Sequence, residues 1–293
     1  MRRVDFENGG IIPNIVQSAF PMLIAQVLNL LYNIVDRIYI ARIPEIGTAA
    51  LGAVGLCFPV IVIITAFSNL FGSGGAPLFA IARGGHEQER ARRILHTSFT
   101  MLVYCAIVLM AAGLLFARPV LALFGASPAA MQYALPYMTI YLLGTLPAML
   151  TTGLNPFVNA QGYVTIGMTS VVIGAAANLV LDPIFIFVLG MGVAGAAVAT
   201  VLSQVLSAAF VLFFLCTKAE YRLRLLPPRA LAANISCLRD IVSLGTAGFI
   251  MQLTNSVVTI CCNNVLAATG GDLYGSVMTI LSSVRQMVET PLS

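Results

Sequence analysis

The stretch VVIGAAANLVLDPIFIFVLG, residues 171–190, is apolar enough to cross a bilayer, yet it carries an acid, Asp182, near its middle. A charged side chain deep in a membrane is costly, so an acid at that depth is a candidate functional residue. Asn178 precedes it by four residues, which places the amide on the same helical face one turn away. A second acid, Asp36, ends another long apolar run. We therefore predict that the two acids share one polar pocket between membrane-spanning helices.

The composition places the whole chain in a membrane. Of its 293 residues, 59% are hydrophobic and only 9% are charged, whereas a soluble domain carries about 25% charged residues. The first apolar run is too long for a signal peptide and lacks a cleavage site of small residues. The six cysteines fall mostly inside apolar runs, without the spacing of a zinc site or a disulfide framework, and we interpret them as packing residues.

Apolar runs of about 20 residues predict spanning helices. Seven complete runs and one more at the end lie near residues 13–38, 48–81, 94–117, 133–159, 164–189, 194–217, 240–268 and 273–293. The fold class that we predict is an all-α integral membrane protein. It has a six-helix transmembrane bundle (1–217), a cytoplasmic linker (218–239) and about two helices of a truncated second bundle (240–293).

The distribution of Lys and Arg predicts the orientation, because these residues concentrate on the cytoplasmic side. With the amino terminus in the cytoplasm, the outer segments hold three of them, Arg37, Arg42 and Arg118. The inner segments then hold eleven, namely Arg2, Arg3, Arg83, Arg90, Arg92, Arg93, Lys218, Arg222, Arg224, Arg229 and Arg239. We therefore expect the amino terminus and the 218–239 linker to be cytoplasmic. The localisation that we expect is the cytoplasmic membrane of a bacterium.

An internal repeat supports two bundles. The stretch LIAQVLNLLYNIVD (23–36) matches FIMQLTNSVVTICC (249–262) at a constant offset, and Asp36 then has Cys262 as its counterpart. Tandem repeats are common in transporters, with sites between or within the lobes. Since a six-helix first half predicts a six-helix second half, we expect this chain to lack most of the second. We expect it not to transport alone, unless two copies pair or a separate chain supplies the rest.

Polar residues recur on one face of several predicted helices. The sets are Gln26, Asn29, Asn33 and Asp36; Tyr133, Tyr137 and Tyr141; Asn178 and Asp182; and Thr200, Ser203, Gln204 and Ser207. A polar face in lipid must point at protein or water, so these stripes predict a water-accessible cavity. Simpler roles stay open: Ser203 and Ser207 bonding their own helix backbone, Tyr133 anchoring at the interface, and Asp36 pairing with Arg37 or Arg42.

The predicted pocket suits a small cation. Low dielectric disfavours the charged form of an acid, and two neighbouring acids resist being ionised together. The pocket would therefore bind a proton, or hold Na⁺ with amide and hydroxyl oxygens completing the shell. Either event changes the local charge and biases one helix packing over another. Pro21 breaks the backbone hydrogen bonding of the first helix ahead of its polar stripe and would serve as the joint.

The stretches around both acids resemble the multidrug and toxic compound extrusion (MATE) transporters, specifically the DNA-damage-inducible (DinF-like) branch. They are FPMLIAQVLNLLYNIVDRIYIARI (20–43), TTGLNPFVNAQG (151–162) and NLVLDPIFIFVLGMGVAGAAVATVLSQ (178–204). The resemblance implies two six-helix bundles around a V-shaped cavity and export of drugs coupled to H⁺ or Na⁺, with no other cofactor. It implies a cation site, open to H⁺ or Na⁺, at Asp36, Asn178, Asp182 and Thr200, accessory positions at Tyr137 and Asn155, and a hinge at Pro21. The implied partners are cationic amphipathic molecules and the bilayer, with a missing carboxy-terminal lobe or a second copy, and no nucleic acid.

Three other functions are weighed against this one. A flippase for lipid-linked oligosaccharides, of the same superfamily, would need cations in its cavity, whereas acids dominate here. An intramembrane enzyme would need a nucleophile with a base or a metal cluster, and His86 and His96 have no partner pattern. A non-transporting regulatory or vestigial fragment is the third alternative.

Overall fold

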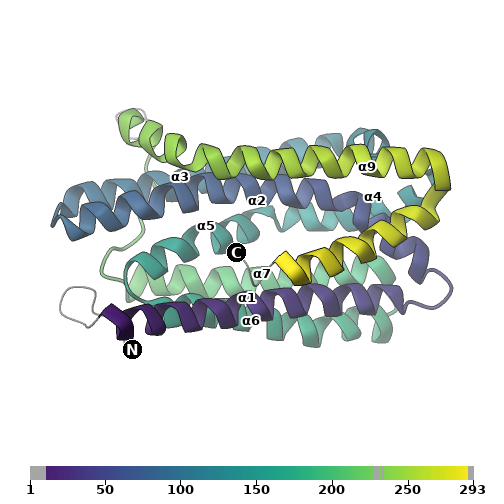
Figure 1. Ribbon diagram of the computed structural model, residues 1–293, viewed down its shortest axis with the longest axis horizontal. Helices are drawn as coiled ribbons and strands as arrows, with labels where there is room; N and C mark the ends of the chain where they lie inside the picture. Colours follow the sequence, from purple (N-terminus) through teal and green to yellow (C-terminus); the bar gives the residue numbers. More distant parts are fainter. Residues whose placement is uncertain (1–10, 228–230, 232–233, 290–293) are drawn as a thin grey trace.

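The chain folds as a bundle of long helices in the computed structural model, which describes residues 11–227, 231 and 234–289. The helices are α1 (Ile11–Ala41), α2 (Gly47–Gly84), α3 (Gln88–Leu123), α4 (Pro128–Leu143), α5 (Thr145–Ala160), α6 (Val164–Pro183), α7 (Gly192–Thr217) and α9 (Ile235–Glu289), with a π-helical turn, η1 (Ile184–Val188), after α6. Helices α2, α3 and α9 form one side of the bundle, α1, α6 and α7 form the other, and α4 and α5 lie between them (Figure 1). The predicted all-α fold is confirmed.

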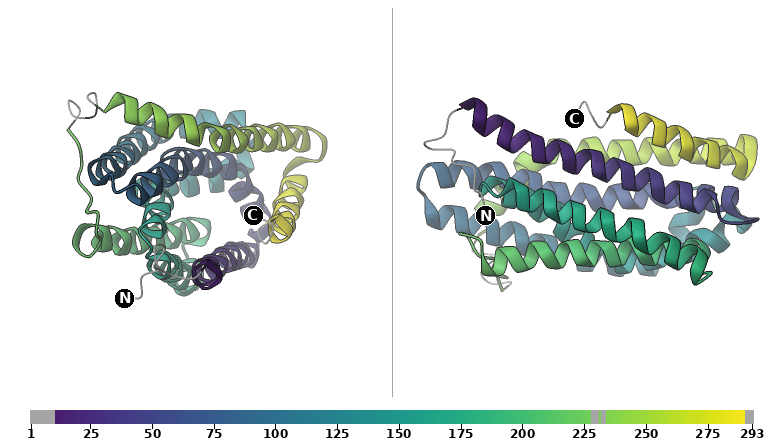
Figure 2. Two further views of the ribbon diagram at one scale, coloured as in Figure 1. Left: turned by 60° about the vertical axis from the view of Figure 1, so that its left-hand side comes forward. Right: turned by 90° about the horizontal axis from the view of Figure 1, so that it is seen from below.

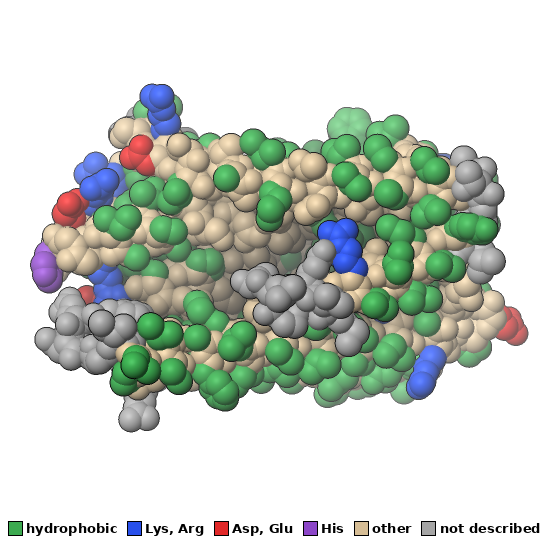
Figure 3. All heavy atoms as spheres, in the orientation of Figure 1, with side chains coloured by type: hydrophobic (Ala, Val, Ile, Leu, Met, Phe, Trp, Pro, Cys, Tyr) green, Lys and Arg blue, Asp and Glu red, His purple; other side chains and the backbone are tan. Residues whose placement is uncertain are grey.

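The outer surface is built for lipid. Within the described residues, six helices are long and apolar enough to cross a membrane, or seven if the bent pair α4–α5 counts as one span. Large apolar side chains lie exposed on the flanks, among them Leu115 at 75% and Val188 at 79%. Charged side chains gather mostly at the two ends of the long axis (Figure 3). The chain is thus a multi-pass membrane protein.

One predicted span, residues 133–159, is broken in the structure. Helices α4 and α5 meet at Gly144 with a bend of 56°. Pro147 lacks an N–H group, so it cannot bond back to Leu143, and the helical ladder opens at this point. A Cβ on Gly144 would lie 2.6 Å from a methyl carbon of Val201 on α7, so the bend lets α7 approach closely.

The two last predicted runs, 240–268 and 273–293, belong to one 55-residue helix, α9. The helix turns back on itself, so that a first arm runs along α2 and α3 and a second arm returns toward α1 (Figure 1). Both arms are fixed to α2: Ser256 donates a hydrogen bond to the carbonyl of Pro59 at 3.1 Å, and Ser276 donates to that of Thr48 at 2.8 Å. Residues 290–293 of the last run lie outside the described residues.

The packing of α1 on α6, and of α6 on α7, brings the predicted polar stripes together. The views from two further sides agree that α1 lies against α6 along much of its length (Figure 2). On α6 the residues Ser170, Gly174, Asn178 and Asp182 recur every fourth position and so share one face. Gly174 contacts Ser207 of α7, which shows that this face is turned toward α7.

Candidate functional site

Asp182 is fully buried, at 0% exposure, and its surroundings come from three helices. The amide of Asn178, one turn earlier on α6, donates a hydrogen bond to Asp182 Oδ1 at 3.1 Å. The same amide nitrogen lies 3.4 Å from the hydroxyl oxygen of Thr200 on α7. One amide therefore links the acid to α7, as the four-residue spacing predicted.

Asp36 of α1 meets Asp182 of α6, since the two carboxyl groups lie within hydrogen-bonding range of each other. Asp36 Oδ1 and Asp182 Oδ2 are buried, and neither has a hydrogen-bond donor among the described residues. Ionised carboxylates are acceptors only, so two of them cannot bond to each other. The pair is complete only when a proton or another cation lies between the carboxyl oxygens.

Two tyrosines of α4 line the site beside the acid pair. Tyr137 and Tyr141 are 3% and 8% exposed, and their rings are stacked with centroids 6.3 Å apart. Tyr137 interacts electrostatically with Asp36, and Tyr141 lies within hydrogen-bonding range of Gln204 on α7. The structure thus brings Tyr137 to the predicted cation site.

Tyr32 is a pocket residue that the sequence analysis missed. It lies one turn before Asp36 on α1 and interacts electrostatically with Asp36, Asp182 and Tyr141. The signal was available, because Tyr32 and Asp36 are four residues apart and must share a helical face. It was overlooked because a tyrosine in an apolar run is less conspicuous than an amide.

The rest of the α1 stripe is only partly in the pocket. Asn33 donates to the side-chain oxygen of Asn29 at 3.1 Å and to its carbonyl at 2.7 Å. Gln26 and Asn29 are exposed. The two asparagines therefore satisfy each other along the helix instead of facing the acid pair.

The structure does not bring Asn155 to the acid pair. Its Oδ1 accepts a hydrogen bond from Ser170 at 3.1 Å, in the seam between α5 and α6. Ser170 and Asp182 are twelve residues apart on α6, a separation of roughly 18 Å at the rise of an α-helix. Asn155 therefore belongs to a second polar cluster, nearer the start of α6.

The simpler roles weighed for the polar residues divide in the same way. Ser203 donates to the carbonyl of Ala199 on its own helix at 2.8 Å, as a membrane serine commonly does. Ser207 instead crosses to α6, where it donates to the carbonyl of Ser170 at 2.8 Å. The guanidinium of Arg37 lies over the ring of Phe58 on α2, 5.1 Å from its centroid. Asp36, by contrast, faces α6.

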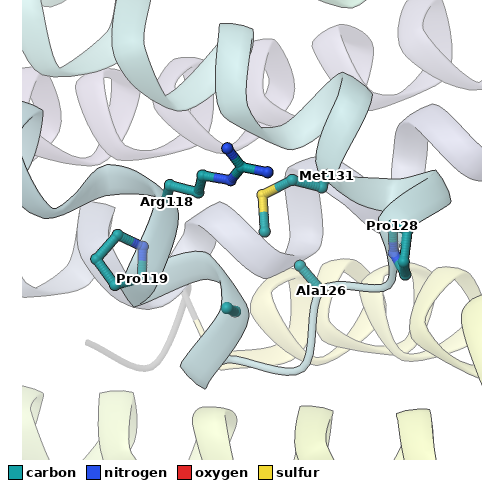
Figure 4. A pocket seen from close by; sticks show the side chains of 6 residues that line it. Arg118, Pro119, Ala126, Pro128 and Met131 are labelled. Atoms are coloured by element: carbon teal, nitrogen blue, oxygen red, sulfur yellow. The ribbon is translucent and has the colours of Figure 1, made fainter.

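The described residues contain no group of three or more His, Cys, Asp or Glu that could hold a metal ion. The acid pair offers two carboxyl groups together with neighbouring hydroxyl and amide oxygens, a donor set suited to a proton or a hard monovalent cation. A separate cavity of about 450 Å³ lies at the turn between α3 and α4, where Arg118 extends beside Met131 (Figure 4). Its lining residues are Arg118, Pro119, Ala122, Ala126, Pro128 and Met131, and none belongs to the acid pair.

Comparison with known proteins identifies the family. The family model described as MatE matches residues 21–184, more than half of the chain, and this range includes both acids, Asn178, Tyr137, Asn155 and Pro21. The chain belongs to the MatE family. MATE proteins are transporters, so the expectation that this chain is not an enzyme holds.

Two curated relatives are multidrug export proteins named MepA. The one from Staphylococcus haemolyticus (strain JCSC1435) is 25% identical over 272 residues, which cover 90% of this chain and 58% of the relative. The one from Staphylococcus aureus (strain MRSA252) is 24% identical over 268 residues, with the same coverage of 90% and 58%. The chain thus spans less than two thirds of the length of these relatives.

Solved MATE structures share the fold. An inward-facing multidrug resistance MATE transporter of the MOP superfamily superposes with a TM-score of 0.77 at 29% identity, covering 90% of this chain and 59% of the other. The MATE multidrug transporter DinF-BH, solved in complex with a drug, superposes with a TM-score of 0.87 at 26% identity, covering 99% of this chain and 64% of the other. Both likenesses extend over nearly all of the described bundle.

Proposed function

We propose that the acid pair of Asp36 and Asp182 is the cation-coupling site of a transporter that exports cationic amphipathic molecules in exchange for H⁺ or Na⁺. The observation that carries the proposal is the meeting of two buried carboxyl groups, each with one oxygen that lacks a donor among the described residues. Such an arrangement is stable with a cation between the oxygens and strained without one. Its charge therefore differs between loaded and empty states.

The neighbours of the pair have distinct roles in this proposal. Asn178 holds Asp182 in place and connects it to Thr200, so that binding at the acids is transmitted to α7. The hydroxyl of Thr200 and the carbonyl oxygen of Asn178 are further ligands when the cation is Na⁺. Tyr137 closes the pocket from the side of α4. Asn155 acts at a distance, through its hydrogen bond to α6.

Neutralising the pair gives α1 a reason to move. An empty pair repels α1 from α6, whereas a shared cation holds the two helices together. Pro21 lies inside α1, fifteen residues before Asp36, where its missing N–H removes one backbone hydrogen bond. We propose that α1 bends there when the cation is exchanged.

The nature of the pocket supports a cationic substrate. Acids attract organic cations, whereas a flippase for anionic lipid headgroups would call for cations in the same place. The multidrug export relatives and the drug complex of DinF-BH support an export function of this kind. The likeness to DinF-BH supports the DinF-like branch, and the excess of Lys and Arg at the end holding Arg83 and Arg90 supports an amino terminus in the cytoplasm. The division into a bundle (1–217), a linker (218–239) and the start of a second bundle (240–293) remains a proposal.

Cation binding tests this function without requiring transport. The full chain in lipid nanodiscs is compared with Asp36→Asn and Asp182→Asn for ²²Na⁺ binding and for proton uptake after a pH jump. We expect the parent to bind one of the two cations and both variants to lose at least tenfold in affinity. Asp240→Asn, which removes an exposed acid on α9, is the matched control and should bind like the parent. Equal binding by the parent and both pocket variants would contradict the proposal.

A further inference from the structure

The segment after α7, residues 218–227, is fixed to the bundle rather than free. We call it the strap; it runs from the end of α7 toward the start of α9 (Figure 1). Its first residues continue the helix end, with Lys218 and Ala219 both donating to the carbonyl of Phe214, at 2.9 and 3.0 Å. Leu223 then bonds back to the carbonyl of Leu215 at 3.3 Å.

The next contacts join the strap to α2 and α5. The backbone N–H of Tyr221 donates to Gln161 Oε1 at 3.2 Å, and Gln161 is fully buried. The ring of Tyr221, 4% exposed, meets that of Phe79 on α2 edge-on at 5.2 Å. Arg83 of α2 lies 3.8 Å from Glu220 and donates to the carbonyl of Ala160 on α5 at 2.7 Å. A strap residue thus completes an aromatic and polar cluster that already joins α2 to α5.

The strap then follows one face of α3. His96 Nε2 lies 3.0 Å from the carbonyl of Arg222, which it can only approach as a donor. Thr100 accepts from the N–H of Leu226 at 3.0 Å, and Tyr104 donates to the carbonyl of the same residue at 3.4 Å. The three α3 residues are four positions apart, so they form a single row on the helix surface.

The dimensions of the two segments match. Four extended residues, from Arg222 to Leu226, cover roughly 13 Å. The α3 row from His96 to Tyr104 covers roughly 12 Å. Thr100 also donates to the carbonyl of His96 at 2.7 Å, so its hydroxyl uses both its donor and an acceptor position. An extended backbone that would otherwise depend on water is therefore satisfied by side chains placed at its own repeat.

We propose that the strap is a conformational device that ties the end of α7 to α2, α3 and α5, so that these four helices move as one unit. Movement of α9 against that unit is then taken up after Leu226, and not along the whole 218–239 linker. The proposal rests on these contacts alone and does not depend on the cation site. It also changes the expected role of the linker, whose first half is part of the bundle.

Two arginines of the strap, Arg222 and Arg224, have exposed side chains and serve as built-in trypsin sites. The full chain in nanodiscs is digested, and cuts at these residues are counted by mass spectrometry. We expect slow cutting in the parent, because a protease needs a detached, extended backbone. Thr100→Val with Tyr104→Phe leaves the backbone groups of Leu226 unbonded, and cutting should accelerate about tenfold, as the open population rises.

Two further variants keep the test decisive. Leu226→Pro removes the N–H of the strap without altering α3, and it should also accelerate cutting. Thr169→Val is the matched control, because the hydroxyl of Thr169 bonds only the carbonyl of Thr165 on its own helix, and it should digest like the parent. Rapid cutting of the parent, or digestion of both strap variants at the parent rate, would overturn the proposal.

Discussion

Asn178 donates a hydrogen bond to Asp182 one turn along α6, at 3.1 Å, and its amide nitrogen also lies 3.4 Å from the hydroxyl of Thr200. An acid buried at 0% exposure thus has one oxygen bonded and one without a donor among the described residues. The bonded oxygen fixes the orientation of the carboxyl group. The other oxygen is left for whatever lies between Asp182 and Asp36.

Replacing Asn178 with Ala should weaken cation binding. The carboxyl group of Asp182 loses its donor and its fixed orientation, and the link to Thr200 is lost. We expect about a tenfold loss of affinity, in line with the worth of a buried hydrogen bond to a charged group. Titration of ²²Na⁺ or of protons measures it, with Asn255→Ala, an exposed amide on α9, as the control. Unchanged affinity would show that Asn178 does not hold the acid.

Replacing Asp36 with Asn should stabilise the protein when no coupling cation is bound. The new amide can donate to the unbonded oxygen of Asp182, and the repulsion between two carboxylates disappears. We expect a gain of about 1–3 kcal/mol in the free energy of unfolding. Thermal unfolding in choline chloride measures it, and the melting temperature should rise for Asp36→Asn but not for Asp240→Asn. A lower melting temperature for Asp36→Asn would indicate that the two acids do not repel each other.

The acid pair and its amide were predictable because helical spacing fixes which residues share a face. Asp182, Asn178 and Thr200 met as expected, and Asp36 joined them because α1 packs on α6. The break at Gly144 was not predicted, because hydropathy averages over a window and a proline inside an apolar run does not lower it enough. The strap was not predicted either. Its contacts with α3 join residues more than 120 positions apart, such as Thr100 and Leu226, and no local pattern encodes them.

Gly72 is expected to be intolerant of a side chain because two helix backbones cross there. A Cβ at Gly72 would lie 2.6 Å from the carbonyl oxygen of Gly153 on α5, and backbone atoms cannot give way as a flexible side chain can. Gly72→Ala should therefore cost about 1–3 kcal/mol of stability. Gly84→Ala is the matched control on the same helix, since nothing lies within 4 Å of its added carbon. The two melting temperatures should differ by several degrees, and equal values would mean that α2 and α5 do not cross this closely.

Asn155 separates what the family resemblance implies from what the geometry supports. The resemblance places it among accessory residues of the cation site, whereas its hydrogen-bond partner is Ser170, twelve residues from Asp182 along α6. If it acts only through that contact, Asn155→Ala should cost about 1 kcal/mol of stability and change cation affinity less than about threefold. Melting temperature and cation titration, measured on the same preparation, separate the two effects. A loss of affinity as large as that of Asn178→Ala would require α5 to approach the acid pair in another state of the transport cycle, and would restore Asn155 to the site itself.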